Sequence, residues 1–168
     1  MTAHALLLGY VVFARFAELL LARRNTRRLL AMGGYEVGRS HYPLIVVTHV
    51  AWILALALLV PTETPPTAHF LIPFILVQII RYWVIHSLGA RWTTRVIVVP
   101  GAALVTRGPY RWLRHPNYLV VFAEMAMLPL VFGVWEIALG FSSVNAVIPS
   151  YRIRIEEAAL GQCQRKFS

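Results

Sequence analysis

The sequence lacks the residues and spacings that several common kinds of site require. It contains no aspartate and one cysteine, Cys163, which cannot form an internal disulfide and therefore indicates no redox compartment. No HxxxH or CxxC pair occurs, which argues against a metal site. No GxGxxG or GKS/T segment occurs either, so the chain has neither a dinucleotide fingerprint nor a phosphate-binding loop.

Acidic residues are also scarce, and the chain is strongly basic as a result. Seven acidic residues stand against 16 Lys and Arg, which gives a net charge of +9 at pH 7. Nucleic-acid-binding proteins gather such charge on one face, whereas these arginines lie next to apolar segments. We therefore expect membrane topology to explain the charge, and we expect no nucleic-acid or metal partner.

The hydrophobic content predicts an integral membrane protein. Hydrophobic residues make up 58% of the 168 residues, and the mean hydropathy of +0.64 is high for a soluble domain. This length suits a single domain over residues 1–168. The first apolar run has no basic region before it and no small-residue cleavage site after it, so we expect it to be a retained helix and not a cleaved signal peptide.

Five apolar segments are predicted to be transmembrane helices, since a crossing needs about 20 residues. They cover about 2–22, 44–60, 69–88 and 116–132, and a fifth begins near 135 and runs past the membrane. The RRNTRR cluster at 23–28 and the arginine-rich loop at 89–115 should be cytoplasmic, whereas the loop at 61–68 has no basic residue and should be external. The predicted fold is therefore all-α, with the N-terminus outside.

Four charged residues stand inside the first four predicted helices, namely Arg15, Glu18, Arg81 and Glu124. Arg15 and Glu18 are three residues apart on one helical face, where they can pair with each other or with a neighbouring helix, or lie near enough to the end to snorkel. Arg81 is costly in lipid unless it faces protein or water, so its helix should turn this side toward a site. The RRNTRR cluster also suits anionic lipid head groups.

Two segments between the helices are predicted to lie at the interface. Residues 29–40 are glycine-rich and should form a broken segment, and RVIVVPGAALV is too short to span and should be extended. Two interpretations of Tyr35, Glu36, His41 and Tyr42 stay open. They are ordinary interfacial residues, or they form the rim of a cytoplasmic pocket.

The stretch LVTRGPYRWLRHPNY at 104–118 is the strongest candidate for chemistry. It places four basic groups, two tyrosines and two prolines between apolar runs, where a membrane chain would otherwise only turn. In the last predicted helix Arg152 and Glu156 lie one turn apart on the same face, and Glu157 is rotated by about 100°. They form either an exposed ion pair or, opposite RHPNY, a holder for a zwitterionic ligand.

These residues resemble the isoprenylcysteine carboxyl methyltransferase family of integral membrane enzymes. The family is marked by GxYxxxRHPxY and a later EExxL, which occur here as GPYRWLRHPNY and EEAAL. The resemblance covers roughly residues 75–160, the expected cofactor and catalytic part. EVGRSHYP and the short C-terminus resemble the compact bacterial branch, whose members are associated with O-methylation of long-chain polyketide phenols and pyrones.

The resemblance implies a SAM-dependent methyltransferase of a bacterial cytoplasmic membrane, with S-adenosyl-L-methionine (SAM) as methyl donor and S-adenosyl-L-homocysteine as product. The cofactor pocket would face the cytoplasm, between the 89–118 loop and the last two helices. Arg152 would face the acceptor, and Glu156 would contact the cofactor. The other residues carried over as cofactor-binding are Leu104, Val105, Tyr110, His115, Pro116, Asn117 and Tyr118.

The acceptor is expected to be a lipophilic small molecule that enters from the bilayer among membrane lipids. The chain ends at Ser168 without the aromatic and basic tail of the eukaryotic members, which argues against a prenylated protein substrate. A carboxylate acceptor would need only Arg152 to orient it. A phenol or enol would be helped by a base, for which Glu156, Glu157 and His115 are the candidates.

Two other functions stay open at this point. RHPNY also occurs in membrane sterol reductases, which use NADPH, although those enzymes are much longer and lack EExxL. A non-catalytic membrane protein would keep the same helices and bind no nucleotide cofactor.

Overall fold

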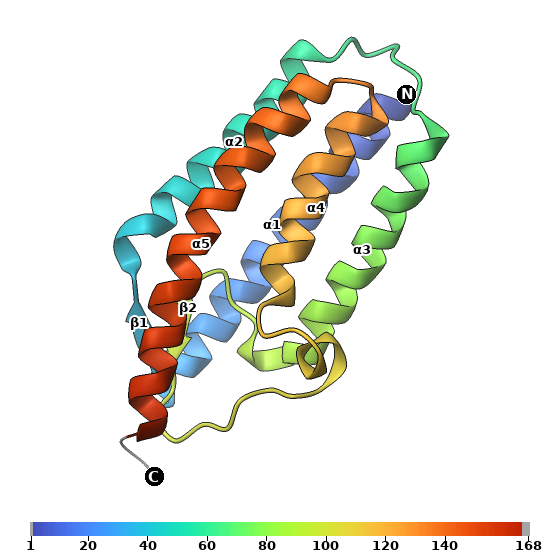
Figure 1. Ribbon diagram of the computed structural model, residues 1–168. Helices are drawn as coiled ribbons and strands as arrows, with labels where there is room; N and C mark the ends of the chain where they lie inside the picture. Colours follow the sequence, from blue (N-terminus) through green and yellow to red (C-terminus); the bar gives the residue numbers. More distant parts are fainter. Residues whose placement is uncertain (1, 166–168) are drawn as a thin grey trace.

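The part of the chain that the structure describes contains five α-helices, as the sequence predicts. The computed structural model describes residues 2–165, with side chains as far as Glu157, so the side chains of Leu160 in EExxL and of Cys163 lie outside the described residues. The helices run side by side in one bundle (Figure 1). They are α1 (Ala3–Ala31), α2 (Tyr42–Leu59), α3 (Ala68–Leu88), α4 (Pro116–Val131) and α5 (Trp135–Arg165).

Helix α1 is longer than the sequence patterning predicts. The expected helix ended at about Ala22, but α1 continues through the arginine cluster to Ala31. Hydropathy marks where a span ends and not where a helix ends, and arginine is a good helix former. Two glycines stop the helix, the first of them in the left-handed region at Gly33 (φ 83°).

Within residues 2–165, three helices are long and apolar enough to cross a membrane, namely α1, α2 and α3, and α4 is a shorter apolar helix. Helix α5 has the length but carries more polar residues. Two of these, Ser142 and Asn145, are buried within the bundle, while Leu139 and Val147 on the same helix are 63% and 71% exposed. Exposed apolar side chains of this size suit contact with lipid, which is consistent with an integral membrane protein.

The hydrophobic core fills the end of the bundle where the chain begins. Side chains from α1 to α4 and the turn after α4 meet there, and the fully buried Trp52 is the largest of them. Burying a large apolar side chain stabilises a fold by roughly 1.5–3 kcal/mol relative to water. The cluster consists of Val11, Trp52, Leu56, Val60, Phe74, Met125, Leu128, Val131 and Phe132.

A network of four buried charges joins α1, α3 and α4 at mid-bundle. Arg81 donates to both carboxylate oxygens of Glu18, at 2.7 and 2.6 Å, and to Glu124 at 3.1 Å. Arg15 donates to Glu18 at 2.9 Å and to Glu124 at 3.3 Å. The two arginines and two glutamates balance in charge, so each buried ion has a partner of opposite sign.

The network corrects one expectation and answers another. Arg15 and Glu18 do not snorkel, because their side chains are only 13% and 9% exposed. Arg81 faces protein, as its cost in lipid requires, but its partners are helix-borne carboxylates and not the walls of a ligand site. Gln78 extends the network by donating to Glu124 at 3.1 Å.

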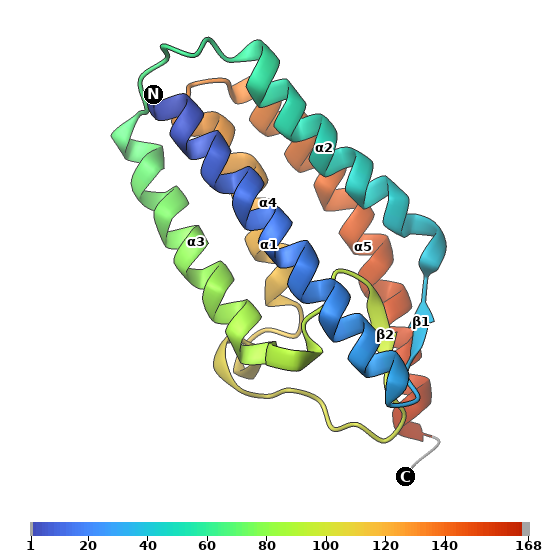
Figure 2. The same cartoon turned by 180° about the vertical axis from the view of Figure 1, so that it is seen from behind.

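A two-stranded antiparallel sheet and a long loop close the other end of the bundle. Strand β1 (Tyr35–Val37) pairs antiparallel with β2 (Val96–Val98), with Tyr35 opposite Val98. The broken segment and the extended segment expected at the interface are therefore partners in one small sheet. Figure 2 shows this sheet beside the ends of α1 and α5, far from the N-terminus.

Candidate functional site

A cavity of about 620 Å³ lies at the end of the bundle that the two-stranded sheet closes. Its walls come from β2, the 104–118 stretch, the first turn of α4 and the last turns of α5. Segments that are far apart in the sequence thus meet around one space. The predicted site residues that line it are Leu104, Val105, Tyr110, His115, Asn117, Tyr118, Arg152 and Glu156.

Pro116 is the one predicted site residue that is not part of the cavity wall. It is the first residue of α4 and is buried. Proline suits this position because a first-turn residue has no intrahelical acceptor for its N–H. Its place in the motif therefore has a structural reason, which is to begin α4 directly after His115.

The glycine of GPYR lets the loop pack directly against α3. Gly108 has a φ of 59°, and a Cβ atom there would lie 2.0 Å from Ser87 Oγ. The neighbouring Arg107 donates from Nε to the Ser87 carbonyl at 2.9 Å. The short 3-10 turn that follows (Gly108–Arg111) is thereby held against α3, with Tyr110 facing the cavity.

Gly108→Ala is expected to lower the free energy of unfolding by roughly 2–5 kcal/mol. The left-handed backbone costs about 1–2 kcal/mol for a residue with a Cβ, and overpacking costs about 1–3 kcal/mol more. Gly101→Ala is the matched control, because Gly101 also has a positive φ (72°) but nothing within 4 Å of a Cβ. Unfolding in detergent measures both, and equal losses would show that contact with Ser87 is unimportant.

The RHPNY turn and α5 meet through a hydrogen bond across the cavity wall. Tyr118 donates from its hydroxyl to Glu156 Oε2 at 2.8 Å. His115 lies close to two carboxylates of α5, with Nδ1 3.9 Å from Glu156 Oε2 and Nε2 3.4 Å from Glu157 Oε1. The two motifs, about 40 residues apart in sequence, form one cluster of titratable groups.

Arg152 is buried beside this cluster and is incompletely paired. It is 7% exposed, and it donates from Nη2 to the Thr94 carbonyl at 2.7 Å. Its guanidinium carbon lies 5.7 Å from the centre of the Tyr118 ring, a cation–π contact. Its Nε has no hydrogen-bond partner among the described residues, so the buried guanidinium keeps a free donor.

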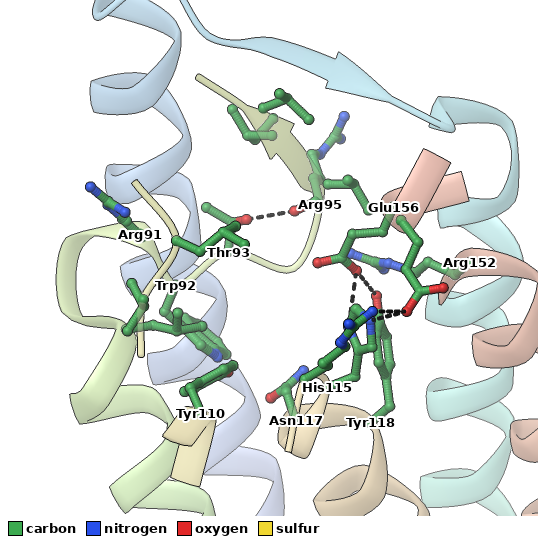
Figure 3. Close-up of a pocket in the computed structure, with 18 of the residues that line it drawn as sticks. Arg91, Trp92, Thr93, Arg95, Tyr110, His115, Asn117, Tyr118, Arg152 and Glu156 are labelled. Carbon is green, nitrogen blue, oxygen red and sulfur yellow. Dashed lines mark hydrogen bonds and ion pairs between the residues drawn. The ribbon is translucent and has the colours of Figure 1, made fainter. Parts of the chain in front are cut away.

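The close-up of the cavity shows two opposed sides (Figure 3). Trp92 and Tyr110 stand on one side, and Arg152, Glu156 and Tyr118 stand on the other. Two aromatic rings therefore face Arg152 and Glu156 across the cavity.

Tyr35, Glu36, His41 and Tyr42 do not line the cavity. Instead, Glu36 accepts two hydrogen bonds from Arg95 Nη1, at 2.8 and 2.9 Å, and the same guanidinium stacks 4.5 Å from the centre of the Tyr42 ring. Arg95 itself is in the cavity wall. Glu36 and Tyr42 thus lie behind the wall, where they hold one of its charges.

Burial shifts the pKa of two groups at this end of the bundle. Burial, and then the Glu156 carboxylate, raise the pKa of Tyr110, so its phenol stays protonated at neutral pH. Burial, and then the positive charge of Arg152, lower the pKa of His41, so its ring is neutral there. Neither group adds charge to the site at neutral pH.

Sequence reasoning placed the 89–118 loop at the pocket but singled out none of its residues before Leu104. Trp92, Thr93, Arg95, Val96 and Val98 all line the cavity. The β-branched run predicted an extended segment, but a strand needs a partner, and YEV at 35–37 is too short to stand out as one. Among the described residues no group of three or more His, Cys, Asp or Glu could hold a metal ion.

The chain is similar to one protein family and to two bacterial proteins. The model of the isoprenylcysteine carboxyl methyltransferase (ICMT) family matches residues 69–162. The uncharacterized protein YpbQ of Bacillus subtilis (strain 168) is 41% identical over 159 residues, which cover 92% of this chain and 95% of that protein. An uncharacterized protein of Haemophilus influenzae is 24% identical over 157 residues, or 89% and 90% of the two chains. No solved structure matches.

Proposed function

The chain belongs to the isoprenylcysteine carboxyl methyltransferase family, and from this premise we propose that it methylates an oxygen atom of a lipophilic acceptor with SAM as the donor. One observation carries the proposal. The hydrogen bond of 2.8 Å from Tyr118 to Glu156 brings the two family motifs to the wall of one cavity.

The residues present fit SAM. The cavity of about 620 Å³ is within the usual range of roughly 300–1,000 Å³ for small-molecule sites. Asn117 Oδ1 is buried in the wall without a hydrogen-bond partner among the described residues, and it would accept from the ammonium group of an amino acid. Trp92 and Tyr110 offer aromatic faces to a cation or an adenine ring.

SAM would supply a methyl group activated by its positively charged sulfur. The protein's part is then chiefly to position the two reactants and exclude water, because well-oriented groups can supply much of the rate enhancement. Glu156, held by Tyr118, would place a negative charge beside the cationic cofactor. Arg152 would direct its free Nε–H toward the acceptor oxygen.

We propose a phenol or pyrone hydroxyl of a long-chain polyketide type, or a carboxyl group, as the acceptor. Apolar side chains of Leu88, Val96 and Val98 share the wall with the charged groups, so the cavity suits an acceptor that is polar only at its reacting end. For a hydroxyl acceptor, Glu156, Glu157 and His115 lie close enough together to take up the proton.

We propose that this end of the bundle faces the cytoplasm of a bacterial membrane. The cluster at 23–28 and the arginines of the 89–115 loop all lie at this end, and the positive-inside rule places such clusters in the cytoplasm. In a Cys163→Ser background, Thr64→Cys should react with an impermeant maleimide on intact cells. Protection of that cysteine until lysis would reverse the orientation.

Binding of S-adenosylhomocysteine tests the cofactor. Calorimetry on detergent-purified protein should show binding of S-adenosylhomocysteine and not of NADPH. Glu156→Ala and His115→Ala should weaken it by about 10-fold or more, since a hydrogen bond to a charged group contributes about 1.5–3 kcal/mol.

Two variants at the opposite end of the bundle serve as controls. Glu136→Ala and His69→Ala remove an exposed glutamate and an exposed histidine and should leave the affinity unchanged. Preference for NADPH would indicate a reductase, and binding of neither compound would indicate a non-catalytic membrane protein.

A further inference from the structure

A second cavity, of about 570 Å³, lies between α1 and α3 and shares no wall residue with the first. We call it the α1–α3 pocket. Its polar side chains are Arg24, Asn25 and Arg28 of α1 and Tyr82 and His86 of α3. Figure 2 shows these two helices adjacent, with the turn that follows α3 running toward α1.

The α1–α3 pocket is positively charged, and no carboxylate neutralises it. Arg24 and Arg28 are one helical turn apart, so both side chains lie on the same face of α1. Among the described residues, no acidic side chain lines the pocket and neither arginine forms an ion pair.

The glutamates lie elsewhere. Glu18 and Glu124 belong to the buried network, and Glu36 pairs with Arg95. Glu156 and Glu157 are at the first cavity. The two others, Glu63 and Glu136, are in the α2–α3 loop and the first turn of α5, at the opposite end of the bundle (Figure 1).

The floor of the α1–α3 pocket is already fixed. Asn25 is buried and donates from Nδ2 to the carbonyls of Gly89 and Trp92, at 3.0 and 2.8 Å. This ties the turn after α3 to α1. A ligand would therefore meet a preformed base and would order only the exposed side chains of Arg24, Arg28 and His86.

The pocket lies at the depth of lipid head groups. With a rise of 1.5 Å per residue, Tyr82 and His86 are roughly 21 and 27 Å along α3 from Ala68, near the end of a hydrocarbon layer about 30 Å thick. Tyr82 and Trp83 are 48% and 45% exposed, as in the aromatic belts at membrane interfaces. Further toward the middle of the membrane, Ile79 of α3 is 59% exposed and offers an apolar surface to acyl chains.

We propose that the α1–α3 pocket binds the phosphate group of an anionic phospholipid. The required chemistry is that of a phosphate ester, whose oxygens would accept from the guanidinium groups of Arg24 and Arg28 and from His86 of α3. The hydroxyl of Tyr82 is engaged by Tyr10 at 2.9 Å, so Tyr82 contributes only its ring to the wall. The position of the pocket at the interface selects a membrane lipid over a soluble phosphate compound. This site is independent of the proposed methyl transfer.

Native mass spectrometry of the detergent-purified protein tests the assignment, with phosphatidylglycerol, phosphatidylcholine and inorganic phosphate as the probes. The wild type should bind phosphatidylglycerol in preference to the other two. The double variant Arg24→Gln/Arg28→Gln should raise its apparent Kd by about 30-fold, since each arginine near a membrane surface contributes about a factor of five.

The matched control is Arg23→Gln/Arg27→Gln, which removes the same charge from the same cluster. Neither residue lines the pocket, and the control should raise the Kd by less than about threefold. Circular dichroism verifies that each variant is folded. If the pocket variant does not fold, the single variant Arg28→Gln should still raise the Kd by about fivefold.

Equal losses in the two double variants would overturn the proposal, because the attraction would then be diffuse. Equal binding of phosphatidylcholine would overturn it as well. Comparable binding of inorganic phosphate, lost in the Arg24→Gln/Arg28→Gln protein, would assign the pocket to a soluble phosphate group and overturn the lipid assignment.

Discussion

Arg81→Met is expected to lower the free energy of unfolding by about 3–5 kcal/mol, the usual result of removing one partner from a buried ion pair. Arg81 is 4% exposed and makes three of the hydrogen bonds that hold Glu18 and Glu124. Without it, two buried carboxylates share the single positive charge of Arg15. Reversible unfolding in detergent, monitored by circular dichroism, measures the loss in the free energy of unfolding.

Two further proteins show whether charge pairing is the cause. Arg23→Met makes the same substitution at an exposed position of α1 and should change the stability little. Replacing Arg15, Glu18, Arg81 and Glu124 together with apolar residues of similar size should recover most of the loss, because a well-packed apolar set can replace a buried ion cluster. A loss in the fourfold variant larger than in Arg81→Met would contradict this explanation.

Arg152→Gln is expected to reduce methyl transfer by about 10²-fold, because Arg152 would orient the acceptor and misplacing a reactant by about 1 Å can cost that much. Arg152 is buried in the cavity wall, its Nε–H has no partner among the described residues, and glutamine is too short to replace its guanidinium. The affinity for S-adenosylhomocysteine should change by less than about fivefold, because the role proposed for Arg152 concerns the acceptor. The measurement follows a labelled methyl group from SAM into extracted membrane lipids.

Arg154→Gln is the matched control, since Arg154 is two residues further along α5, carries the same charge and is exposed. It should methylate the extract at the wild-type rate. Full activity in Arg152→Gln would remove that arginine from the proposed mechanism. A large loss of S-adenosylhomocysteine affinity instead would place Arg152 on the cofactor and not on the acceptor.

The helices were predictable because each apolar run is long and is interrupted by clear signals. Prolines mark the loop between α2 and α3, Pro116 begins α4, and Gly133 lies in the turn before α5 at a φ of 73°. The family was predictable from two short motifs, and the matched residues 69–162 agree with the expected range of about 75–160.

The candidate site was only half predictable. Residues of GPYRWLRHPNY and the Arg152–Glu156 pair have distinctive spacing, and the structure places them around one cavity. The part of the wall that β2 contributes has no such signal, since β2 and its partner β1 have three residues each and are nearly 60 residues apart in sequence. Arg95 is held in the cavity wall by Glu36 of β1 and by Tyr42, the first residue of α2.

The sequence by itself determined the five helices, the arginine-rich end and the family, because these depend on local composition and spacing. Tertiary structure alone decided which partners the buried charges take. Arg81 of α3 could have faced a ligand site, but it pairs with Glu18 of α1 and Glu124 of α4. Periodicity places a side chain on a helix face, but only packing decides which other helix that face meets.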